Sequence, residues 1–392
     1  MSELYLNKAQ FVAELEKCLQ CRTKPCKEAC PVKCSPHDFI DKAKNGDMKA
    51  AAGIIARQNP FGETCGLICP DKFCMRACLR KHIDAPIRIP AVQAQIMYTA
   101  RKDKSITAVK CKKANGKRIA VVGSGPAGMG AAVKLAQSGF AVTVYEKENI
   151  AGGALNLIPS ERLPRKIIAD EWQKVCDDYD LEIKLNTQIE NYENLLNEGF
   201  AAVIVATGEQ KSRSLGILGE NLTVDFQQYL KNPQQYQTKG AIAVIGGGAA
   251  AVDCAVTATH QGAKHTEMFV RRALSNMRIT ETERKSLWEA QVDITTMTRV
   301  TKIEKNGADL TLYTCKTRFN NDNKLEDIPH TEIARGGFDY VILALGSIRN
   351  EEICESDKIF YAGDVLNGSS TAVEALASGQ QTAEKVDEIF AV

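Results

Sequence analysis

The spacing of hydrophobic positions changes at about residue 118. Before that point, FVAELEKCLQ and MKAAAGIIARQ place apolar residues at helical intervals, and no run alternates as a half-buried strand would. From Arg118 onward, short apolar strands are followed by glycine turns and alanine-rich helices, which is typical of doubly wound α/β domains. The pattern predicts a helical N-terminal region followed by α/β structure.

The strand, glycine turn and helix occur twice. The first unit reads RIAVV, GSGPAGMGAAVKLAQSG and FAVTVYE, and the second reads AIAVI, GGGAAAVDCAVTATHQG and KHTEMFV. Two further segments, AAVIVATG and KIFYAGDV, look like strands of the first unit, although the second unit lies between them. We therefore expect an all-α domain over residues 1–110, a Rossmann-like domain over 114–237 and 338–392, and a second Rossmann-like domain inserted at 238–337.

The composition of the chain mainly excludes certain classes of protein. The chain has 392 residues, of which 44% are hydrophobic and 25% charged, and this is enough for two or three globular cores. Its 50 basic and 48 acidic residues give no field that would attract nucleic acid or an anionic membrane. MSELYLNKAQ does not resemble an export signal, and no apolar stretch approaches the roughly 20 residues of a membrane span. A cytoplasmic protein is expected.

The stretch from 101 to 117 has no apolar periodicity and contains seven basic residues and one acidic residue. A solvated linker is the prediction, and a docking patch for a partner is the alternative.

Nine of the fourteen cysteines fall between Cys18 and Cys78. Without an export signal, metal thiolates are a better interpretation than disulfides. The spacing C-x2-C-x4-C-x3-C followed by proline, and a second run with C-x3-C-P, are typical of ferredoxin-type ligation, in which the cysteine before proline serves the other cluster. Structural zinc is the alternative, since C-x2-C pairs also bind zinc.

This logic predicts ligands that cross between the two runs. Cys18, Cys21 and Cys26 would bind one cluster, most simply with Cys78, and Cys30 would join Cys69 and Cys74 at the second. The second cluster then lacks one ligand. Cys34 and Cys65 are the thiol candidates, although an unligated cysteine is more often a packed small hydrophobe.

The first glycine turn carries the G-x-G-x-x-G fingerprint of dinucleotide binding at Gly123, Gly125 and Gly128. Glu146 ends the following strand, where a carboxylate accepts hydrogen bonds from an adenosine ribose. No C-x-x-C lies in the α/β region, which argues against a flavoenzyme that exchanges disulfides.

The second turn, Gly246 to Ala251, keeps two glycines of the fingerprint and indicates a second nucleotide. Its next strand ends without a carboxylate, and Arg271, Arg272 and Arg278 follow instead. Guanidinium groups at this position favour a 2′-phosphate, whereas a solvated basic turn is the alternative. Hydride transfer from nicotinamide to flavin needs positioning more than an acid or base, so no catalytic proton-transfer residue is nominated.

Together these segments resemble a known family. CLQCRTKPCKEACP, NPFGETCGLICPDKFCMRAC, VVGSGPAGMGAA, FVRRALSNMR and AGDVLNGSSTAVEALASGQ are similar to the electron-input half of dihydropyrimidine dehydrogenase and to its separate NAD(P)H-binding subunit in bacteria. The chain is also similar to the small subunit of glutamate synthase. The resemblance covers essentially the whole chain.

The resemblance implies FAD, NADP(H) and two 4Fe-4S clusters, and it implies Gln93 as the ligand that completes the second cluster. For FAD it implies Gly123, Gly125, Pro126, Ala127, Gly128, Glu146, Lys147, Gly152, Gly153, Arg162, Ile189, Gly208, Gly363, Asp364, Ser370, Thr371 and Ala372. For NADP it implies Gly246, Gly247, Gly248, Ala249, Ala250, Arg271, Arg272, Arg278, Ala344 and Gly346. Relatives usually have an aspartate where this chain has Ala249, so the nicotinamide site departs from the family pattern at this position.

The expected function is an NAD(P)H oxidoreductase subunit that passes electrons from FAD through two clusters to an FMN-barrel partner. Since the sequence stops at Val392, it leaves no room for a barrel of about 250 residues, which we expect on another polypeptide. A glutamate synthase small subunit is the alternative from another enzyme class, and a zinc-bound, flavin-stabilised scaffold is the alternative that is not an enzyme.

Overall fold

A computed structural model describes residues 4–106, 109, 111–350, 352–354 and 356–390, so part of the stretch expected to be a linker lies outside the described residues. The chain forms two compact units. The first contains Met1–Asn156, Ser160–Gln210 and Arg349–Val392, and the second contains Leu157–Pro159 and Lys211–Ile348. In the described part of the chain, no helix is long and apolar enough to cross a membrane.

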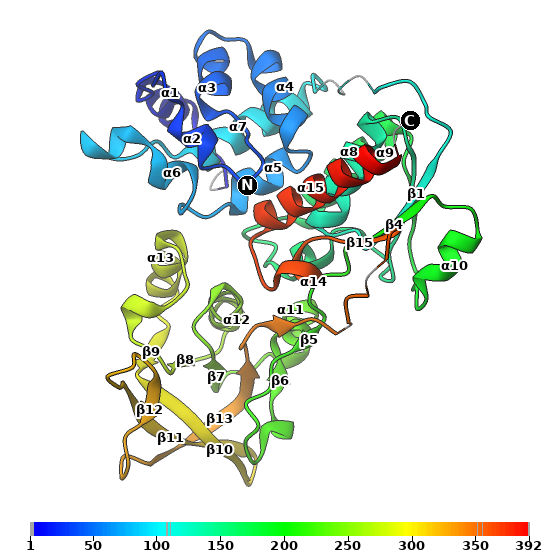
Figure 1. The fold of residues 1–392 in the computed structure, drawn as a ribbon. Coiled ribbons are helices and arrows are strands. Elements are labelled where there is room, and N and C mark those ends of the chain that lie inside the picture. The colour runs from blue at the N-terminus through cyan, green and yellow to red at the C-terminus, as the bar shows by residue number, and fades with distance from the viewer. Residues whose placement is uncertain (1–3, 107–108, 110, 351, 355, 391–392) are drawn as a thin grey trace. The chain divides into compact units, whose positions relative to one another are not determined.

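The N-terminal part of the first unit is helical, as Figure 1 shows in blue and cyan. Its α-helices are α1 (Lys8–Glu16), α2 (Pro25–Glu28), α3 (Pro36–Lys44), α4 (Met48–Gln58), α5 (Gly62–Ile68), α6 (Cys74–Ala77) and α7 (Ile89–Lys102), and the short 3-10 helix η1 (Leu79–His82) follows α6. The first backbone N–H groups of a helix have no partner within the helix. Several helices here begin at a residue that accepts a hydrogen bond from such a group, or at a proline, which has no N–H. Asn7 closes a capping box at α1, and α3 has Pro36 at its start.

The rest of the first unit is a parallel sheet of five strands in the order β15-β4-β1-β2-β3. The strands are β1 (Arg118–Val122), β2 (Ala141–Tyr145), β3 (Glu182–Lys184), β4 (Ala202–Val205) and β15 (Ile359–Tyr361). Apart from the exposed Arg118 that begins β1, the central strands β1 and β4 are apolar because helices cover both faces. The chain leaves this sheet after β4 and returns at β15, which is how one domain is interrupted by another.

Helices α8 (Pro126–Gln137), α9 (Arg165–Tyr179) and α15 (Ala372–Phe390) pack near the sheet, and α8 lies along α15. The opposite face is covered by α10 (Tyr192–Asn197) and α14 (Asp364–Asn367), whose Leu195 and Val365 join a core cluster with Val203 and Val205 of β4. Helix α9 also contacts α5 of the helical part, so the two parts form one compact unit.

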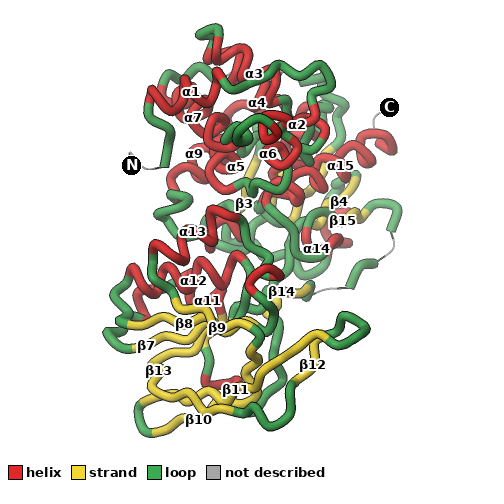
Figure 2. Tube along the Cα trace, turned by 90° about the vertical axis from the view of Figure 1, so that its left-hand side faces the viewer, coloured by secondary structure: helices red, strands yellow, loops and turns green. Residues whose placement is uncertain are grey.

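The second unit contains a mixed sheet in the order β10-β11-β13-β7-β8-β9 (Figure 2). Its parallel strands are β13 (Ile333–Leu343), β7 (Ala241–Ile245), β8 (His265–Val270) and β9 (Asp293–Thr296), while β10 (Thr298–Asn306) and β11 (Asp309–Phe319) form an antiparallel hairpin. The short strands β6 (Val224–Asp225) and β12 (Leu325–Asp327) pair with β13 and β11. A separate pair, β5 (Lys211–Ser212) and β14 (Ser347–Ile348), joins the chain entering the unit to the chain leaving it.

The alternation along β7 divides the second unit into two cores. Ile242 and Val244 pack with α11 (Phe226–Lys231), α12 (Ala249–His260) and α13 (Glu281–Glu289). Ala243 and Ile245 face the β10–β11 hairpin on the other side. Figure 2 shows the three helices on one side of the strands. The fold is thus the expected α/β class, with two Rossmann-like sheets and a helical N-terminal part. The domain limits expected at 237/238 and 337/338 remain predictions.

Candidate functional site

Four of the predicted cluster ligands surround one small cavity. Cys18, Cys21, Cys26 and Cys78 line a space of about 30 Å³ together with apolar neighbours from α3 and the turn after α6. Cys18 and Cys21 come from the turn between α1 and α2, Cys26 lies in α2, and Cys78 ends α6 from the other cysteine run. Burial raises the pKa of the Cys18 thiol, and it raises that of Cys26 to about 11. A group that binds here must therefore displace protons from these thiols.

A second set of thiols is more deeply buried. Burial raises the pKa of Cys69, and the neighbouring Cys65, Cys74 and Cys30 raise it further, so these side chains lie close together. Burial raises the pKa of Cys74 to about 12, and among the neighbouring charges Cys30 raises it most. No His, Cys, Asp and Glu side chains in the described part of the chain form a group around a single ion position, so the grouping of the thiols rests on the cavity and on their mutual electrostatic effects.

Three residues were candidates for the missing ligand. Cys34 and Cys65 are buried, and Cys34 has Cys30 as its largest charge neighbour. Gln93, in α7, is 8% exposed, and its Nε2 donates a hydrogen bond of 2.8 Å to the carbonyl of Gly62 at the start of α5. The amide is thus held next to the helix that carries Cys65. The donor set, thiols plus one amide oxygen, fits an iron-sulfur cluster, and Gln93 remains a prediction as its ligand.

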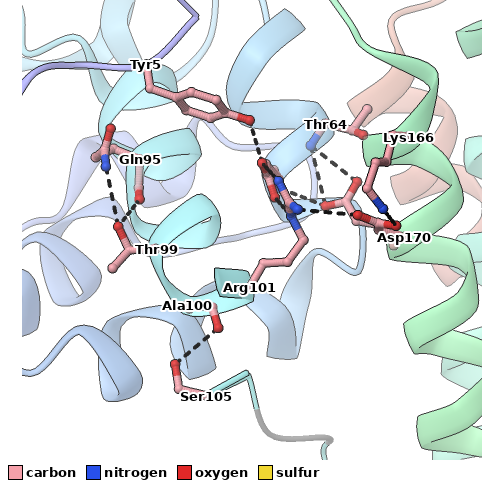
Figure 3. Close-up of polar contacts among 11 residues, drawn as sticks. Tyr5, Thr64, Gln95, Thr99, Ala100, Arg101, Ser105, Lys166 and Asp170 are labelled. Atoms are coloured by element: carbon pink, nitrogen blue, oxygen red, sulfur yellow. Dashed lines mark hydrogen bonds and ion pairs between the residues drawn. The ribbon is translucent and has the colours of Figure 1, made fainter. Parts of the chain in front are cut away.

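A polar network joins the helical part to α9 (Figure 3). Arg101 of α7 forms a two-pronged ion pair with Glu63, at 2.7 and 2.8 Å, and reaches Asp170 of α9 at 3.3 Å. Tyr5 donates a hydrogen bond of 2.5 Å to Glu63 as well. Figure 3 shows Arg101 between Tyr5 and Asp170.

Glu171, next in α9, completes the junction. Its carboxylate accepts hydrogen bonds from the backbone N–H groups of Glu63, at 2.7 Å, and Thr64, at 3.3 and 3.4 Å. Burial raises the Glu171 pKa to about 8, and the nearby Glu63 carboxylate raises it too, against the lowering by these hydrogen bonds. Trp172 follows, and its indole N–H donates 3.1 Å to the carbonyl of Ser124. One turn of α9 therefore contacts both the cysteine-bearing helix α5 and the first glycine turn.

The first glycine turn connects β1 to α8, as predicted. Gly123 has φ of +107°, and a Cβ there would stand 2.4 Å from the carbonyl oxygen of Ala206 after β4. Only glycine allows this approach of two strand ends. Gly125 caps α8, whose first residues are Pro126, Ala127 and Gly128. Such a helix start presents free N–H groups to a pyrophosphate.

Glu146 is buried directly after β2, beside this turn. Its Oε2 accepts hydrogen bonds from the backbone N–H of Ser124, at 3.0 Å, and from the Ser124 hydroxyl, and its Oε1 accepts one from the N–H of Glu148. Gly152 and Gly153 lie nearby, since Gly152 donates from its N–H to the Ser124 carbonyl at 3.2 Å. The predicted ribose carboxylate therefore also fixes the loop.

The Gly363-Asp364 turn lies between β15 and α15 in the same unit. Gly363 lies against Ala127 of α8, and a Cβ on Gly363 would stand only 2.6 Å from the Ala127 side chain. Burial raises the Asp364 pKa, and Ser370 donates to its carboxylate. Thr371 closes the start of α15 by a reciprocal pair of hydrogen bonds with Glu374, and Ala372 begins the helix.

The remaining residues predicted for FAD are more dispersed. Lys147 donates to the side chain of Gln210 at 2.7 Å, and Ile189 packs against the core cluster under β4. Arg162 is half-buried in the loop before α9, and Gly208 has open space around it after β4. All lie in the first unit, and their role at a flavin stays a prediction.

The second glycine turn repeats the geometry of the first. Gly246 follows β7 with φ of +153°, and a Cβ there would stand 2.2 Å from the carbonyl oxygen of Ala344, which follows β13. Gly247 and Gly248 continue the turn, and Ala249 and Ala250 begin α12. Ala344 and Gly346 were both predicted for NADP, and Ala344 lies at the same strand edge as Gly246.

Arg271, Arg272 and Arg278 follow β8, at the edge where the second glycine turn lies. The N–H of Arg278 donates 3.2 Å to the carbonyl of Gly247, which brings this segment to the turn. Arg271 and Arg272 are held from the other side. Thr317 donates to the Arg271 carbonyl at 2.7 Å, and Met297 donates to that of Arg272 at 3.1 Å.

Sequence reasoning missed one arginine at this edge. Burial lowers the Arg271 pKa, and the positive charges of Arg272 and Arg299 lower it further, so Arg299 of β10 belongs to the same cluster. Its guanidinium is paired with Asp327 of β12. No local motif marks Arg299, which lies 28 positions after Arg271 in the chain. It comes close to β8 only because the β10–β11 hairpin folds beside that strand.

Comparison with known proteins places this site in a family. A model of the pyridine nucleotide-disulphide oxidoreductase family matches residues 117–379, and a model of the 4Fe-4S cluster domain II of dihydropyrimidine dehydrogenase matches residues 2–105. The fold and site therefore define an NAD(P)H-dependent oxidoreductase with FAD and iron-sulfur chemistry. The chain belongs to the pyridine nucleotide-disulphide oxidoreductase family.

Two curated relatives are similar over nearly the whole chain. The NAD-dependent dihydropyrimidine dehydrogenase subunit PreT of Escherichia coli K12 is 29% identical, with 96% of this chain and 93% of that protein covered. The glutamate synthase [NADPH] small chain of Bacillus subtilis is 26% identical, with 95% and 89% covered. Among solved structures, Mycobacterium tuberculosis FprA in complex with NADPH has a TM-score of 0.57 at 16% identity, over 69% of this chain and 84% of that one, and this likeness concerns the fold.

Proposed function

We propose that the chain is the electron-input subunit of a larger reductase. NADPH would bind at the second glycine turn and FAD at the first, where hydride transfer gives the flavin two electrons. Two 4Fe-4S clusters would then carry these electrons singly to a partner, most simply an FMN-containing dihydropyrimidine dehydrogenase subunit. The similarity to PreT supports this choice.

The observation that carries the proposal is the junction at α9. Glu171 contacts the backbone at the start of α5, which carries Cys65 and leads to Cys69, and Trp172 contacts the first glycine turn. The first glycine turn, where we predict the flavin, and the second thiol set are thus connected within one compact unit. Such proximity is required of an electron relay, whereas it serves no purpose for zinc sites that only stabilise a fold.

Position along the fold suggests an order for the relay. Cys69 of the second set ends α5, the helix that contacts α9, whereas Cys18 and Cys21 of the first set lie between α1 and α2. Electrons would therefore reach the second set first and leave from the first set. In this proposal the two thiol sets hold the two clusters and keep them apart.

The test begins with anaerobically purified protein. We expect about eight irons and eight acid-labile sulfides per chain, with bound FAD and NADPH oxidation by ferricyanide. We expect no reduction of uracil or thymine until an FMN-barrel subunit is added. Zinc in place of iron would contradict the cluster assignment, and uracil reduction by the pure chain would contradict the need for a partner.

The second candidate function is the small subunit of glutamate synthase, favoured by the similarity to the Bacillus subtilis protein. Mixing the chain with a glutaminase-containing synthase subunit tests it directly. NADPH-dependent formation of glutamate in that mixture, without coupling to an FMN-barrel subunit, would replace our proposal with this one.

A further inference from the structure

Large apolar side chains are exposed around the first thiol set. Leu19, between Cys18 and Cys21, and Leu79, directly after Cys78, line the same cavity as these thiols, yet each is 42% exposed. Ile83, just beyond η1, is 65% exposed. Apolar groups grouped at a functional site, unlike scattered ones, are typical of a surface that another protein covers.

The two segments that carry these thiols are strongly basic. Residues 17–24 and 76–82 contain six lysines and arginines and no aspartate or glutamate, although basic and acidic residues nearly balance over the whole chain. The six are Lys17, Arg22, Lys24, Arg76, Arg80 and Lys81.

Only half of these charges are neutralised by the protein itself. Lys17, Lys24 and Arg80 have carboxylate partners, which are Glu14, Asp38 and Asp84 respectively. The other three form no ion pair within the described part of the chain, and Lys81 donates instead to the carbonyl of Arg76 at 2.5 Å. The two thiol-bearing segments therefore combine exposed apolar side chains with excess positive charge.

We propose that this surface, called here the exit patch, is the docking site of an electron-accepting protein with an acidic rim around its own redox centre. The exit patch consists of Leu19, Leu79, Ile83 and the six basic residues named above. An apolar centre with a charged rim is the usual anatomy of a transient interface, and complementary charge increases the rate of encounter.

The proposal rests on the proposed function, because it assumes that the first thiol set holds a cluster. The electron balance fixes the stoichiometry. Each NADPH that loses a hydride yields NADP⁺ and two electrons, and each docked one-electron acceptor takes one of them. Two acceptor molecules are therefore reduced for each NADPH oxidised, with release of one proton.

The experiment compares two one-electron acceptor proteins of opposite charge, acidic rubredoxin and basic cytochrome c. The patch variant combines Arg22→Glu and Lys81→Glu. The matched control combines Lys49→Glu in α4 and Lys385→Glu in α15, which are exposed and lie outside the patch. Rates are measured anaerobically with NADPH at low and high ionic strength, and iron content and the rate of FAD bleaching by NADPH are recorded for each variant.

At low salt we expect the patch variant to reduce rubredoxin more slowly than the parent protein does, by about tenfold or more. At high salt this difference should disappear. Cytochrome c should be reduced faster by the patch variant, and the control variant should match the parent with both acceptors. Ile83→Ser should slow rubredoxin reduction at high salt too, while Leu185→Ser, another exposed apolar residue, should not.

Equal rubredoxin rates for the patch and control variants, or equal slowing with both acceptors, would overturn the exit patch. Failure of the proposed function looks different. In that case the parent protein itself would lack iron and would reduce neither acceptor, although FAD bleaching by NADPH could continue. The two failures are therefore distinguishable in one set of measurements.

Discussion

Glu171 accepts a hydrogen bond of 2.7 Å from the backbone N–H of Glu63, a residue that carries a carboxylate of its own. Arg101 neutralises Glu63 through two contacts, but no cation is paired with Glu171 in the described part of the chain. The buried Glu171 side chain therefore prefers its proton, and this preference makes the junction between α9 and α5 sensitive to pH.

We expect the stability of the first unit to fall between pH 4.5 and 8. The Glu171 pKa is 4.5 when unperturbed and about 8 in the folded protein. In this window the folded state holds a proton that the unfolded state has released, so the free energy of unfolding decreases as pH rises, by at most about 1.4 kcal/mol per pH unit. Thermal unfolding across the window, followed by circular dichroism, measures this slope.

Two variants isolate the carboxyl group. Glu171→Gln keeps an acceptor for the N–H groups of Glu63 and Thr64 but cannot ionise, so its slope should be smaller and its stability at pH 8 higher than that of the parent. Glu171→Ala leaves those N–H groups unpaired, at a cost of about 1–3 kcal/mol. Asp177→Asn, on the exposed side of α9, is the control. An unchanged slope in Glu171→Gln would contradict this assignment.

Replacing Gln93 by Leu should perturb one cluster and leave the other. The substitution removes the amide oxygen predicted to bind the cluster, and it removes the 2.8 Å hydrogen bond to the carbonyl of Gly62. Electron paramagnetic resonance of the reduced protein and iron analysis detect the change. Gln95→Leu is the matched control, since Gln95 lies in the same helix and its side-chain amide donates to Thr99 rather than to α5. Loss of both cluster signals, or of neither, would count against the role of Gln93.

Changing both Arg271 and Arg272 to Ser should remove most of the preference for NADPH over NADH. Each charge-assisted contact with a 2′-phosphate is worth roughly 1.5–3 kcal/mol, so two contacts give discrimination on the order of a hundredfold or more. The ratio of kcat/KM for the two nucleotides is the measurement. If the unmodified protein used NADH as well as NADPH or better, these arginines would have no such role.

Arg299 provides a sharper test of the same site. Because its charge reaches Arg271, Arg299→Ser should weaken NADPH use by roughly tenfold, the effect of about 1.4 kcal/mol, while NADH use stays the same. Arg318→Ser is the control, since Arg318 also lies on the β10–β11 hairpin and pairs with Glu326 rather than with this cluster. Equal effects of both substitutions would indicate a general loss of charge.

Local sequence patterns were enough to predict the class of fold and the type of chemistry. A strand, a glycine turn and a helix are specified by neighbouring residues, so the turns at Gly123 and Gly246 could be predicted, and the family models confirm the oxidoreductase class. Cysteine spacing is also local information, and the ferredoxin-type pattern that it matches predicted Cys78 beside Cys18, Cys21 and Cys26, which line one cavity in the structure.

Contacts between side chains far apart in the chain could not be predicted in this way, because they depend on how whole elements pack. The contact of Glu171 with Glu63 spans 108 positions, and Arg299 reaches Arg271 only because an antiparallel hairpin folds beside β8. Leu19 and Leu79 likewise share one cavity although they come from separate cysteine runs. Periodicity shows which face of an element is buried, but packing of whole elements sets which neighbours that face receives.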